Sequence, residues 1–306
     1  MVVHSSRSRS RASAPVVAAV DIGGTKLAAA VVTPDGDIVG GRTCPTGGDG
    51  PEGLFETLRR LTESAIESSG LTPEVVGVGC GGPMTRSGVT VSPLNIPQWR
   101  QFELHSRLVD AFGLPVHIEN DAKALALGER WLGAARSVDN FIALVVSTGI
   151  GGGIVLDGRL VDGASGNAGH LGHVIVDPLG RPCPCGTRGC LEAQVSGSAI
   201  FAATGVAAQF APVALRHRCG LLVGRALAST ASLLDLRLAV VAGSVALGFG
   251  DDFFRAAQAE ADRCARLDFS RGLQIIPAGN GANGPILGAA AVARAALGCD
   301  RPMTAD

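Results

Sequence analysis

The stretch from residue 172 to residue 192, GHVIVDPLGRPCPCGTRGCLE, contains one histidine and three cysteines in the order His-x9-Cys-x-Cys-x4-Cys. Zinc favours tetrahedral sets of thiolate and imidazole ligands, and structural zinc sites use all four positions. The alternatives are a loop with incidental thiols and a disulfide, although two cysteines separated by one residue rarely bridge without strain. The spacing therefore predicts a structural zinc site with the ligands His173, Cys183, Cys185 and Cys190.

Two glycine-rich turns, DIGGTK (Asp21–Lys26) and STGIGGGI (Ser147–Ile154), are candidate phosphate sites. Neither has the spacing of a P-loop that leads into a helix, but backbone N–H groups of a glycine hairpin can still bind phosphate. A tight hairpin explains either turn alone, whereas two turns in matching positions favour a nucleotide clamp, with Asp21 able to hold Mg²⁺ through water. The candidate ATP-binding residues are Asp21, Gly23, Gly24, Thr25, Lys26, Thr148, Gly149, Gly151 and Gly152.

The sequence IENDA places Asn120 and Asp121 where a predicted strand runs into a predicted helix. Asp121 is a candidate general base, because phosphoryl transfer to an alcohol needs a carboxylate that orients the hydroxyl and accepts its proton. Aspartate at that position also caps helices, so Asp121 by itself leaves both roles open. Asn95, between two prolines in PLNIPQW, could bind sugar hydroxyls or be a turn residue.

These residues are spread over a chain whose two halves share one predicted layout. Residues 16–40 and 140–161 each have the pattern of strand, glycine-rich turn, strand, Asp-Gly turn and strand. This pseudo-repeat predicts two related α/β lobes that face each other. Helices are predicted over 53–70, 102–113, 121–133, 197–211, 220–235 and 284–298, and further strands near 74–80, 115–120 and 238–242.

Composition excludes several classes of protein. The net charge of -1 offers no bulk attraction to nucleic acid or a membrane surface, and the chain has no run of 18 apolar residues. Residues 1–14 are basic and serine-rich without the apolar core of a secretory signal, so they are predicted to be a disordered tail. We therefore expect a cytoplasmic protein with reduced thiols.

Taken in order, the motifs DIGGTK, LNIPQW, END, STGIGGGI, GHLGHVIVDP with CPCGTRGCLEAQVSG, and GPILGAAAVAR resemble those of the ROK family of sugar kinases and repressors. The resemblance implies a two-lobed α/β fold of the actin-like, ribonuclease H-like ATPase type. It implies an N-terminal lobe of residues 15–121 with about 285–300, and a C-terminal lobe of residues 122–284 with a zinc loop at 173–190. It also implies a homodimer that binds ATP with Mg²⁺ across the cleft and a sugar between the lobes.

The resemblance also implies a role for individual residues. Asp121 would take the proton from the 6-hydroxyl of the sugar, and His173 would contact both zinc and sugar. Gly243 and Ser244, in AGSVALG, would lie at the adenosine site. The implied sugar contacts are Asn95, Asn120, Asp121, His170, His173 and Glu192.

His170 bears on the choice of sugar. Glucokinase-like members have glutamate there, in GExGH, whereas GHLGH resembles the bacterial N-acetylmannosamine kinases. An imidazole can donate to an acetamido carbonyl that a carboxylate would repel. The resemblance thus implies ATP-dependent 6-phosphorylation of N-acetyl-D-mannosamine, in sialic acid catabolism, with glucokinase as the first alternative.

A non-catalytic sugar-binding or regulatory protein is the second alternative. The segment 200–230 is shorter than is usual in the family, on the side of the cleft where adenosine would bind. A DNA-binding repressor is disfavoured, because only 20 residues precede Asp21.

Overall fold

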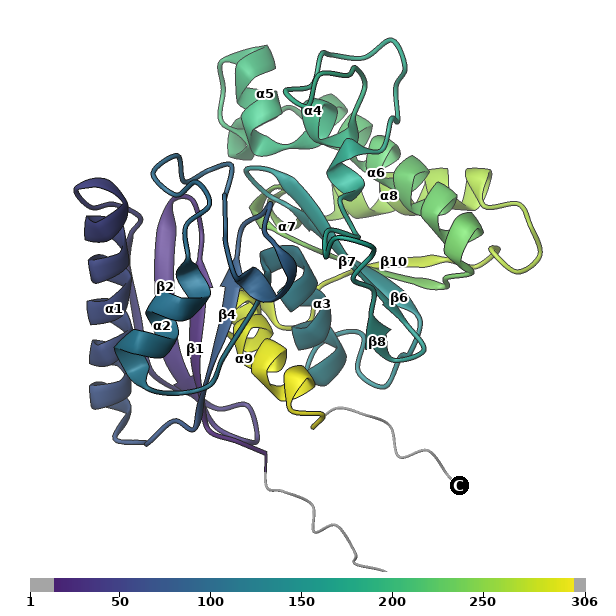
Figure 1. Ribbon diagram of the computed structural model, residues 1–306. Helices are drawn as coiled ribbons and strands as arrows, with labels where there is room; N and C mark the ends of the chain where they lie inside the picture. Colours follow the sequence, from purple (N-terminus) through teal and green to yellow (C-terminus); the bar gives the residue numbers. More distant parts are fainter. Residues whose placement is uncertain (1–13, 300–306) are drawn as a thin grey trace, which may run out of the picture.

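The computed structural model describes residues 14–299, so the tail predicted over residues 1–14 lies outside this range except for Ala14. The described residues form two five-stranded mixed sheets with helices between and outside them (Figure 1). Among residues 14–299, no helix combines the length and apolar character that a membrane crossing needs.

The first sheet has the strand order β3-β2-β1-β4-β5. Strand β1 pairs antiparallel with β2 and parallel with β4, while β2 pairs antiparallel with β3. The first three strands therefore form the predicted meander, and the glycine turn DIGGTK lies between the first two. The bounds are β1 Val17–Ile22, β2 Lys26–Val32, β3 Ile38–Pro45, β4 Val75–Cys80 and β5 Val116–Asn120.

The second sheet repeats this topology with the order β10-β9-β6-β7-β8. Strand β6 pairs antiparallel with β7 and parallel with β9, so it takes the place that β1 has in the first sheet. The predicted internal repeat is confirmed in the backbone. The bounds are β6 Phe141–Val146, β7 Ile150–Leu156, β8 Arg159–Leu160, β9 Leu238–Ala242 and β10 Gln274–Pro277.

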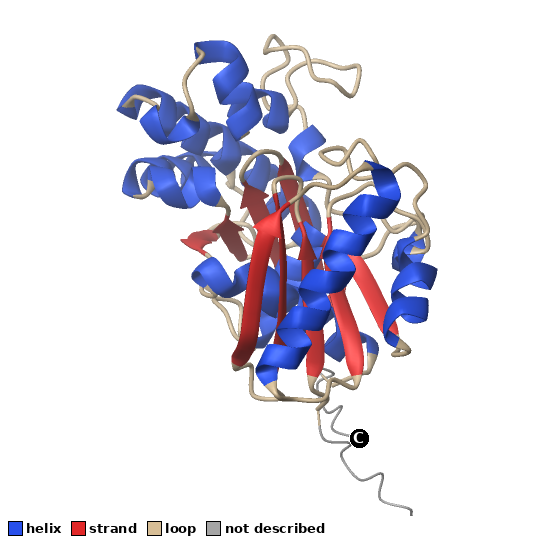
Figure 2. Cartoon of the chain, turned by 90° about the vertical axis from the view of Figure 1, so that its left-hand side faces the viewer, coloured by secondary structure: helices blue, strands red, loops and turns tan. Residues whose placement is uncertain are grey.

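The central strands are buried on both faces. In β1, Ala18 and Val20 belong to one apolar cluster, whereas Val17 and Ala19 belong to another. Successive side chains of a strand point to opposite faces, so an apolar strand of this kind must be covered on both sides. Helices α1 (Gly50–Ser69) and α2 (Leu104–Phe112) cover the outer face of the first sheet (Figure 2).

Helices α3 (Asp121–Trp131) and α9 (Gly284–Ala296) lie between the two sheets (Figure 1). Their backbones approach so closely that a Cβ atom on Gly288 would lie 2.8 Å from the carbonyl oxygen of Ala124. The buried carboxylate of Glu129, on α3, accepts hydrogen bonds from the N–H groups of Gly279 and Asn280 at 2.8 and 3.0 Å. Helix α3 is therefore fixed both to α9 and to the segment that follows β10.

Five helices, most of them on the outer face of the second sheet, complete the fold. Their bounds are α4 Leu191–Val195, α5 Gly197–Thr204, α6 Val213–Leu234, α7 Ser244–Phe249 and α8 Asp251–Cys264. The helix predicted over 197–211 ends at Thr204, because Gly205 takes a left-handed φ of 69°. The helix predicted from residue 220 begins at Val213, and neither α8 nor β10 was predicted.

Candidate functional site

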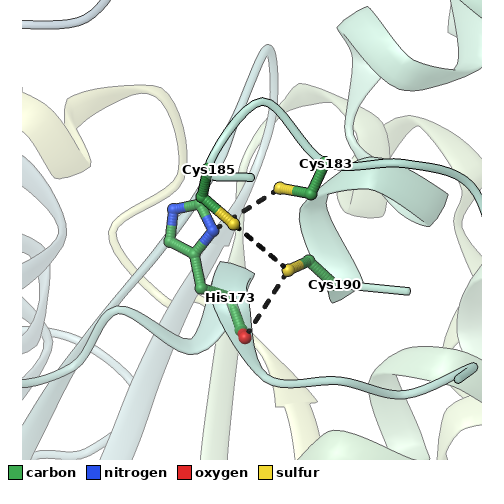
Figure 3. A group of neighbouring side chains, drawn as sticks. All are labelled: His173, Cys183, Cys185 and Cys190. Atoms are coloured by element: carbon green, nitrogen blue, oxygen red, sulfur yellow. Dashed lines mark hydrogen bonds between the residues drawn. The ribbon is translucent and has the colours of Figure 1, made fainter. Parts of the chain in front are cut away.

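The four predicted zinc ligands lie together. One ligand atom each from His173, Cys183, Cys185 and Cys190 fall within 4.8 Å of one another (Figure 3). The Sγ atoms of Cys185 and Cys190 are 3.7 Å apart, and Nδ1 of His173 is 3.7 Å from Sγ of Cys183. A tetrahedron with Zn–S bonds of about 2.3 Å has edges of roughly 3.8 Å, so the spacing and the donor set fit zinc.

Backbone contacts shape the loop that carries these ligands. The N–H of Cys183 donates to the carbonyl of Thr187 at 2.8 Å, which closes a tight hairpin. A hydrogen bond from the backbone of Thr187 is the main cause that lowers the pKa of Cys185 to about 7, which favours the thiolate that a metal needs. Gly189 has a φ of 79°, and a Cβ there would lie 1.9 Å from the carbonyl oxygen of Asp177, so this position requires glycine.

Arg181 ties the same loop to helix α4. Its Nε donates to the carbonyl oxygen of Ala193 at 2.9 Å, and its guanidinium also bonds the carbonyl of Gln194. Since α4 begins right after Cys190 and carries Glu192, the loop and the glutamate are held as one unit.

Strand β5 ends at Asn120, and α3 begins at Asp121. The side chain of Asn120 caps the helix by accepting the N–H of Ala122 at 3.0 Å, and Oδ1 of Asp121 accepts the same N–H at 2.8 Å. Both asparagine and aspartate therefore cap α3. The capping bond of Asp121 uses Oδ1, so Oδ2 is the oxygen left for a chemical role.

Asp121 and Asp21 form an electrostatic pair across the ends of β1 and α3. Asp121 keeps an exposed surface, yet many protein atoms surround its carboxyl group, and this partial desolvation raises its pKa. Burial is also the largest cause that raises the pKa of Asp21 to about 7, followed by the negative charge of Asp121, while Lys26 lowers it. The site therefore holds one of its two carboxyl groups partly protonated near neutral pH.

His170 lies near Asp121, Glu192 and His173. Burial is the main cause that lowers the pKa of His170, and the charge of His173 lowers it further, while the two carboxylates act in the opposite direction. The ring centroids of His170 and His173 are 6.2 Å apart. Asp121, His170, His173 and Glu192, four of the six predicted sugar contacts, are thus brought together, and Asn120 adjoins Asp121 at the start of α3.

Glu192 connects this group to the second glycine turn. Its Oε2 accepts the N–H of Ile150, the first residue of β7, at 2.7 Å. A Cβ on Gly149 would lie 2.9 Å from the same oxygen. One carboxylate oxygen of Glu192 is therefore occupied by the backbone of the turn.

The first glycine turn touches Asn95. A Cβ on Gly24 would lie only 2.4 Å from the Cβ of Asn95, so glycine is needed for the contact. Thr46, just after β3, supports the turn: its N–H donates to the carbonyl of Thr25 at 3.0 Å, and its hydroxyl donates to the carbonyl of Gly23 at 2.7 Å. The fifth predicted sugar contact therefore adjoins the first candidate phosphate turn.

The second glycine turn meets the predicted adenosine turn. The hydroxyl groups of Ser147 and Ser244 are 3.0 Å apart, and a Cβ on Gly243 would lie 2.3 Å from the carbonyl oxygen of Val146. By contrast, Gly151 and Gly152 lie inside β7. A Cβ on Gly151 would lie 2.9 Å from the Cβ of Ala122, so close packing of α3 is a sufficient reason for that glycine.

Three charged residues with a structural part near the site escaped the sequence analysis: Lys123, Glu129 and Arg181. The charged groups of Lys123 and Glu129 bond segments distant in the chain, and that of Arg181 bonds helix α4, which follows 10 residues later. The signal in the sequence was slight: Lys123 and Glu129 are charged positions within the apolar pattern of DAKALALGERW.

Residues 17–296 match the model of the ROK family. The chain is 38% identical over 250 residues to an N-acetylmannosamine kinase of Citrobacter koseri, covering 76% of this chain and 84% of that protein. It is 42% identical over 183 residues to a glucokinase of Thermotoga maritima, covering 59% of this chain. That second match spans 57% of the Thermotoga protein, little more than half its length.

A solved structure has the same fold. The ROK family glucokinase of Streptomyces griseus, in complex with glucose and AMPPNP, superposes with a TM-score of 0.79 at 31% identity, covering 92% of this chain and 99% of that one. The predicted actin-like ATPase fold is confirmed by this likeness. Because the family match spans nearly all the described residues, the chain belongs to the ROK family.

Proposed function

We propose that this protein is an ATP-dependent sugar kinase that phosphorylates the 6-hydroxyl of N-acetyl-D-mannosamine. The observation that carries the proposal is the placement of His170 beside Asp121 and Glu192. An imidazole there offers a hydrogen-bond donor to an acetamido carbonyl between two carboxylates that bind hydroxyl groups. The similarity to the Citrobacter N-acetylmannosamine kinase supports it.

Asp121 is the proposed base. It accepts the proton of the 6-hydroxyl while the sugar oxygen attacks the terminal phosphorus of ATP and ADP leaves. Its raised pKa makes it a stronger proton acceptor than an aspartate with the ordinary pKa, as a general base requires. Asn95, Asn120, His173 and Glu192 would hold the other hydroxyl groups and orient the sugar.

The glycine turns are the proposed ATP site. Backbone N–H groups of Gly24 and Gly149 would face the phosphates, with Thr25, Lys26 and Thr148 beside them. The N–H of Gly23 closes the turn by donating to the carbonyl of Lys26 at 3.0 Å. Asp21 would hold Mg²⁺ through water, and the cation would favour the ionised form of this carboxyl group. Gly243 and Ser244 would border the adenosine, and Gly151 and Gly152 would support the turn from β7.

Zinc, held by the His173 and cysteine cluster, would supply rigidity only. His173 presents Nδ1 to the thiols, so Nε2 is the ring nitrogen left for a sugar hydroxyl. We further propose that the lobes comprise residues 15–121 with about 285–300, and residues 122–284, in a homodimer.

A coupled assay of ADP release over a panel of hexoses and N-acylhexosamines tests the proposal, with zinc content measured on the same sample. We expect the highest kcat/KM for N-acetylmannosamine, and one zinc ion per chain. The matched variant is His170→Glu, which should shift the preference toward glucose. Stronger turnover of glucose by the wild-type protein would overturn the choice of sugar and leave the kinase assignment.

Glucokinase is the second candidate. It is supported by the Thermotoga relative, which has higher identity over a shorter segment. An assay that detects sugar binding but no ADP release with any sugar would favour the non-catalytic alternative.

A further inference from the structure

Two residues after Asp121, a lysine is almost entirely buried. The side chain of Lys123 is 2% exposed, and its ammonium group has three oxygen partners. Nζ lies 2.9 Å from Oε1 of Glu119, 2.9 Å from Oδ1 of Asp162 and 3.2 Å from the carbonyl oxygen of Gly166. An ammonium group has three donors, so this arrangement can satisfy all of them.

The partners of Lys123 belong to three different parts of the fold. Glu119 is on β5 of the first sheet, Lys123 is on α3, and the other two partners lie in residues 162–169, which follow β8 of the second sheet. We refer to residues 162–169 as the 162–169 segment. It leads directly into His170, so whatever fixes this segment also fixes the start of the proposed sugar contacts.

The first part of the 162–169 segment depends mainly on such side chains. Its last residue, Gly169, packs against β7, where a Cβ would lie 2.2 Å from the carbonyl oxygen of Gly152. The segment contains no helix or strand, and Gly163, Gly166 and Gly169 have φ values of 75°, 88° and 99°. Within the segment, one backbone bond runs from the N–H of Ala168 to the carbonyl of Asp162, at 3.0 Å. Glycine-rich backbone of this kind gains no order from its own conformational preferences.

A second side chain supports the same half of the segment. Nη2 of Arg86 donates to the carbonyl oxygens of Gly163 and Ala164 at 3.0 and 3.2 Å. Arg86, Lys123 and Asp162 line a cavity of about 820 Å³, so on this side the segment borders open space instead of a packed apolar core. Polar contacts must therefore replace the packing that fixes other loops.

We propose that Lys123 is a positioning residue that holds the 162–169 segment against the helix of the catalytic base and thereby sets the place of His170. Lys123 itself does not touch the sugar. The inference rests on the proposed function only for its kinetic consequence, because the contacts of Lys123 are independent of what the site binds. Sugar selection by His170 would then depend on Lys123, which acts through the 162–169 segment.

The test compares Lys123→Met with Lys123→Arg and Asp162→Asn. Lys123→Met removes all three contacts, Asp162→Asn removes the charge on the segment only, and Lys123→Arg restores a cation. Arg107→Met is the matched control, since it breaks the Arg107–Glu52 ion pair between α2 and α1. Hydrogen exchange of peptides that cover residues 162–170 and 183–192 is the first readout, and it needs no turnover.

We expect faster exchange over residues 162–170 in Lys123→Met and, less so, in Asp162→Asn, with residues 183–192 and zinc content unchanged. KM for the sugar should rise about 10-fold, because small misplacements of a binding group are costly, while KM for ATP stays within about twofold. Lys123→Arg should recover part of both losses, and the control should show neither.

Unchanged hydrogen exchange over residues 162–170 in both Lys123→Met and Asp162→Asn would overturn the proposal. An equal rise in KM for the sugar and KM for ATP would overturn it too. If Lys123→Met fails to fold, Asp162→Asn alone decides, because its partner Lys123 keeps Glu119. A wild-type protein without kinase activity would remove the proposed function, and the exchange result would still decide whether Lys123 fixes the segment.

Discussion

At the scale of single residues, the site is organised by two carboxyl groups with different surroundings. Asp121 is held by the N–H of Ala122 and lies near His170, whereas Asp21 lies near Lys26 and in the field of Asp121 itself. Both pKa values lie above the ordinary value near 3.8, although the Ala122 N–H, His170 and Lys26 act to lower them. Desolvation by the surrounding protein atoms is the main cause for both, so both should titrate at higher pH than aspartates with the ordinary pKa.

The first prediction concerns Asp121→Asn. Loss of the base should lower kcat by about 10²- to 10⁴-fold, while sugar affinity measured by calorimetry changes little, because the amide keeps the shape of the side chain. In the wild-type protein, kcat/KM should fall as the pH drops through the raised pKa of Asp121, since the ionised form is the active one. A variant with an unaltered rate would show that Asp121 is only a helix cap.

The second prediction concerns Asp21→Asn. Because the folded-state pKa of about 7 exceeds 3.8, the folded protein binds the proton more tightly, and stability falls as the pH rises between these values. The variant should therefore have a higher Tm than the wild type at pH 8 and a similar Tm at pH 4, with weakened ATP binding. Thermal unfolding at both pH values measures this, with the exposed Asp35→Asn as control. An identical Tm difference at the two pH values would contradict it.

At the scale of elements, the loop of residues 173–190 and the short helix α4 hold the proposed zinc ligands and Glu192 in place. The zinc loop is shaped by turns that only certain glycines allow, and Arg181 fastens it to α4. Strand β7 is likewise built around glycine: a Cβ on Gly153 would lie 2.8 Å from both the carbonyl oxygen of Ala122 and the Cβ of Ala126. Helix α3, which carries Asp121, can therefore lie this close to β7 only because the facing positions of β7 have no side chains.

The third prediction uses two glycines of the same loop. Gly186 and Gly189 both have positive φ values, of 96° and 79°, but only Gly189 has atoms within 4 Å of an added Cβ. Gly186→Ala should lower the free energy of unfolding by about 1 kcal/mol through backbone strain alone. Gly189→Ala must also displace the carbonyl of Asp177, so it should cost more and weaken metal binding. Chemical unfolding and zinc titration check this, and equal losses would show that the clash is relieved.

Some of this could be predicted from sequence. The zinc ligands were found because metal chemistry demands particular donors at short spacing, and the meanders were found because glycine turns between apolar strands are local signals. Helix α8 was missed although Phe253, Ala256, Ala257 and Ala261 have helical spacing and give the segment a clear apolar stripe. The contact of Asn95 with Gly24 and the bonds of Lys123 join distant segments, which no local pattern encodes.

At the scale of the whole molecule, α3 and α9 form a layer shared by both sheets. Helix α9 packs against the first sheet, and α3 packs against the second. The two helices meet at glycines: a Cβ on Gly128 would lie 2.9 Å from the backbone nitrogen of Gly288. Because the same layer belongs to both cores, we expect the two sheets to unfold together.

The fourth prediction tests that layer with two glycines of α9. A Cβ on Gly288 would lie 2.8 Å from the carbonyl oxygen of Ala124, whereas on Gly284 its nearest neighbour is a side-chain atom at 3.8 Å. Gly288→Ala should therefore lower the free energy of unfolding by about 1–3 kcal/mol. Gly284→Ala should be neutral or slightly stabilising, because alanine favours a helix. Calorimetry checks both, and a Gly288→Ala protein as stable as the Gly284→Ala protein would contradict the packing argument.

The contact between Gly24 and Asn95 has one more consequence. Gly24, in the turn proposed to hold phosphate, is in van der Waals contact with Asn95, which is proposed to bind the sugar. Any displacement of the turn when a nucleotide arrives must push on the asparagine, and a seated sugar must stiffen the turn in return. The affinity for ATP should therefore depend on whether the sugar is bound, and the affinity for the sugar on whether ATP is bound.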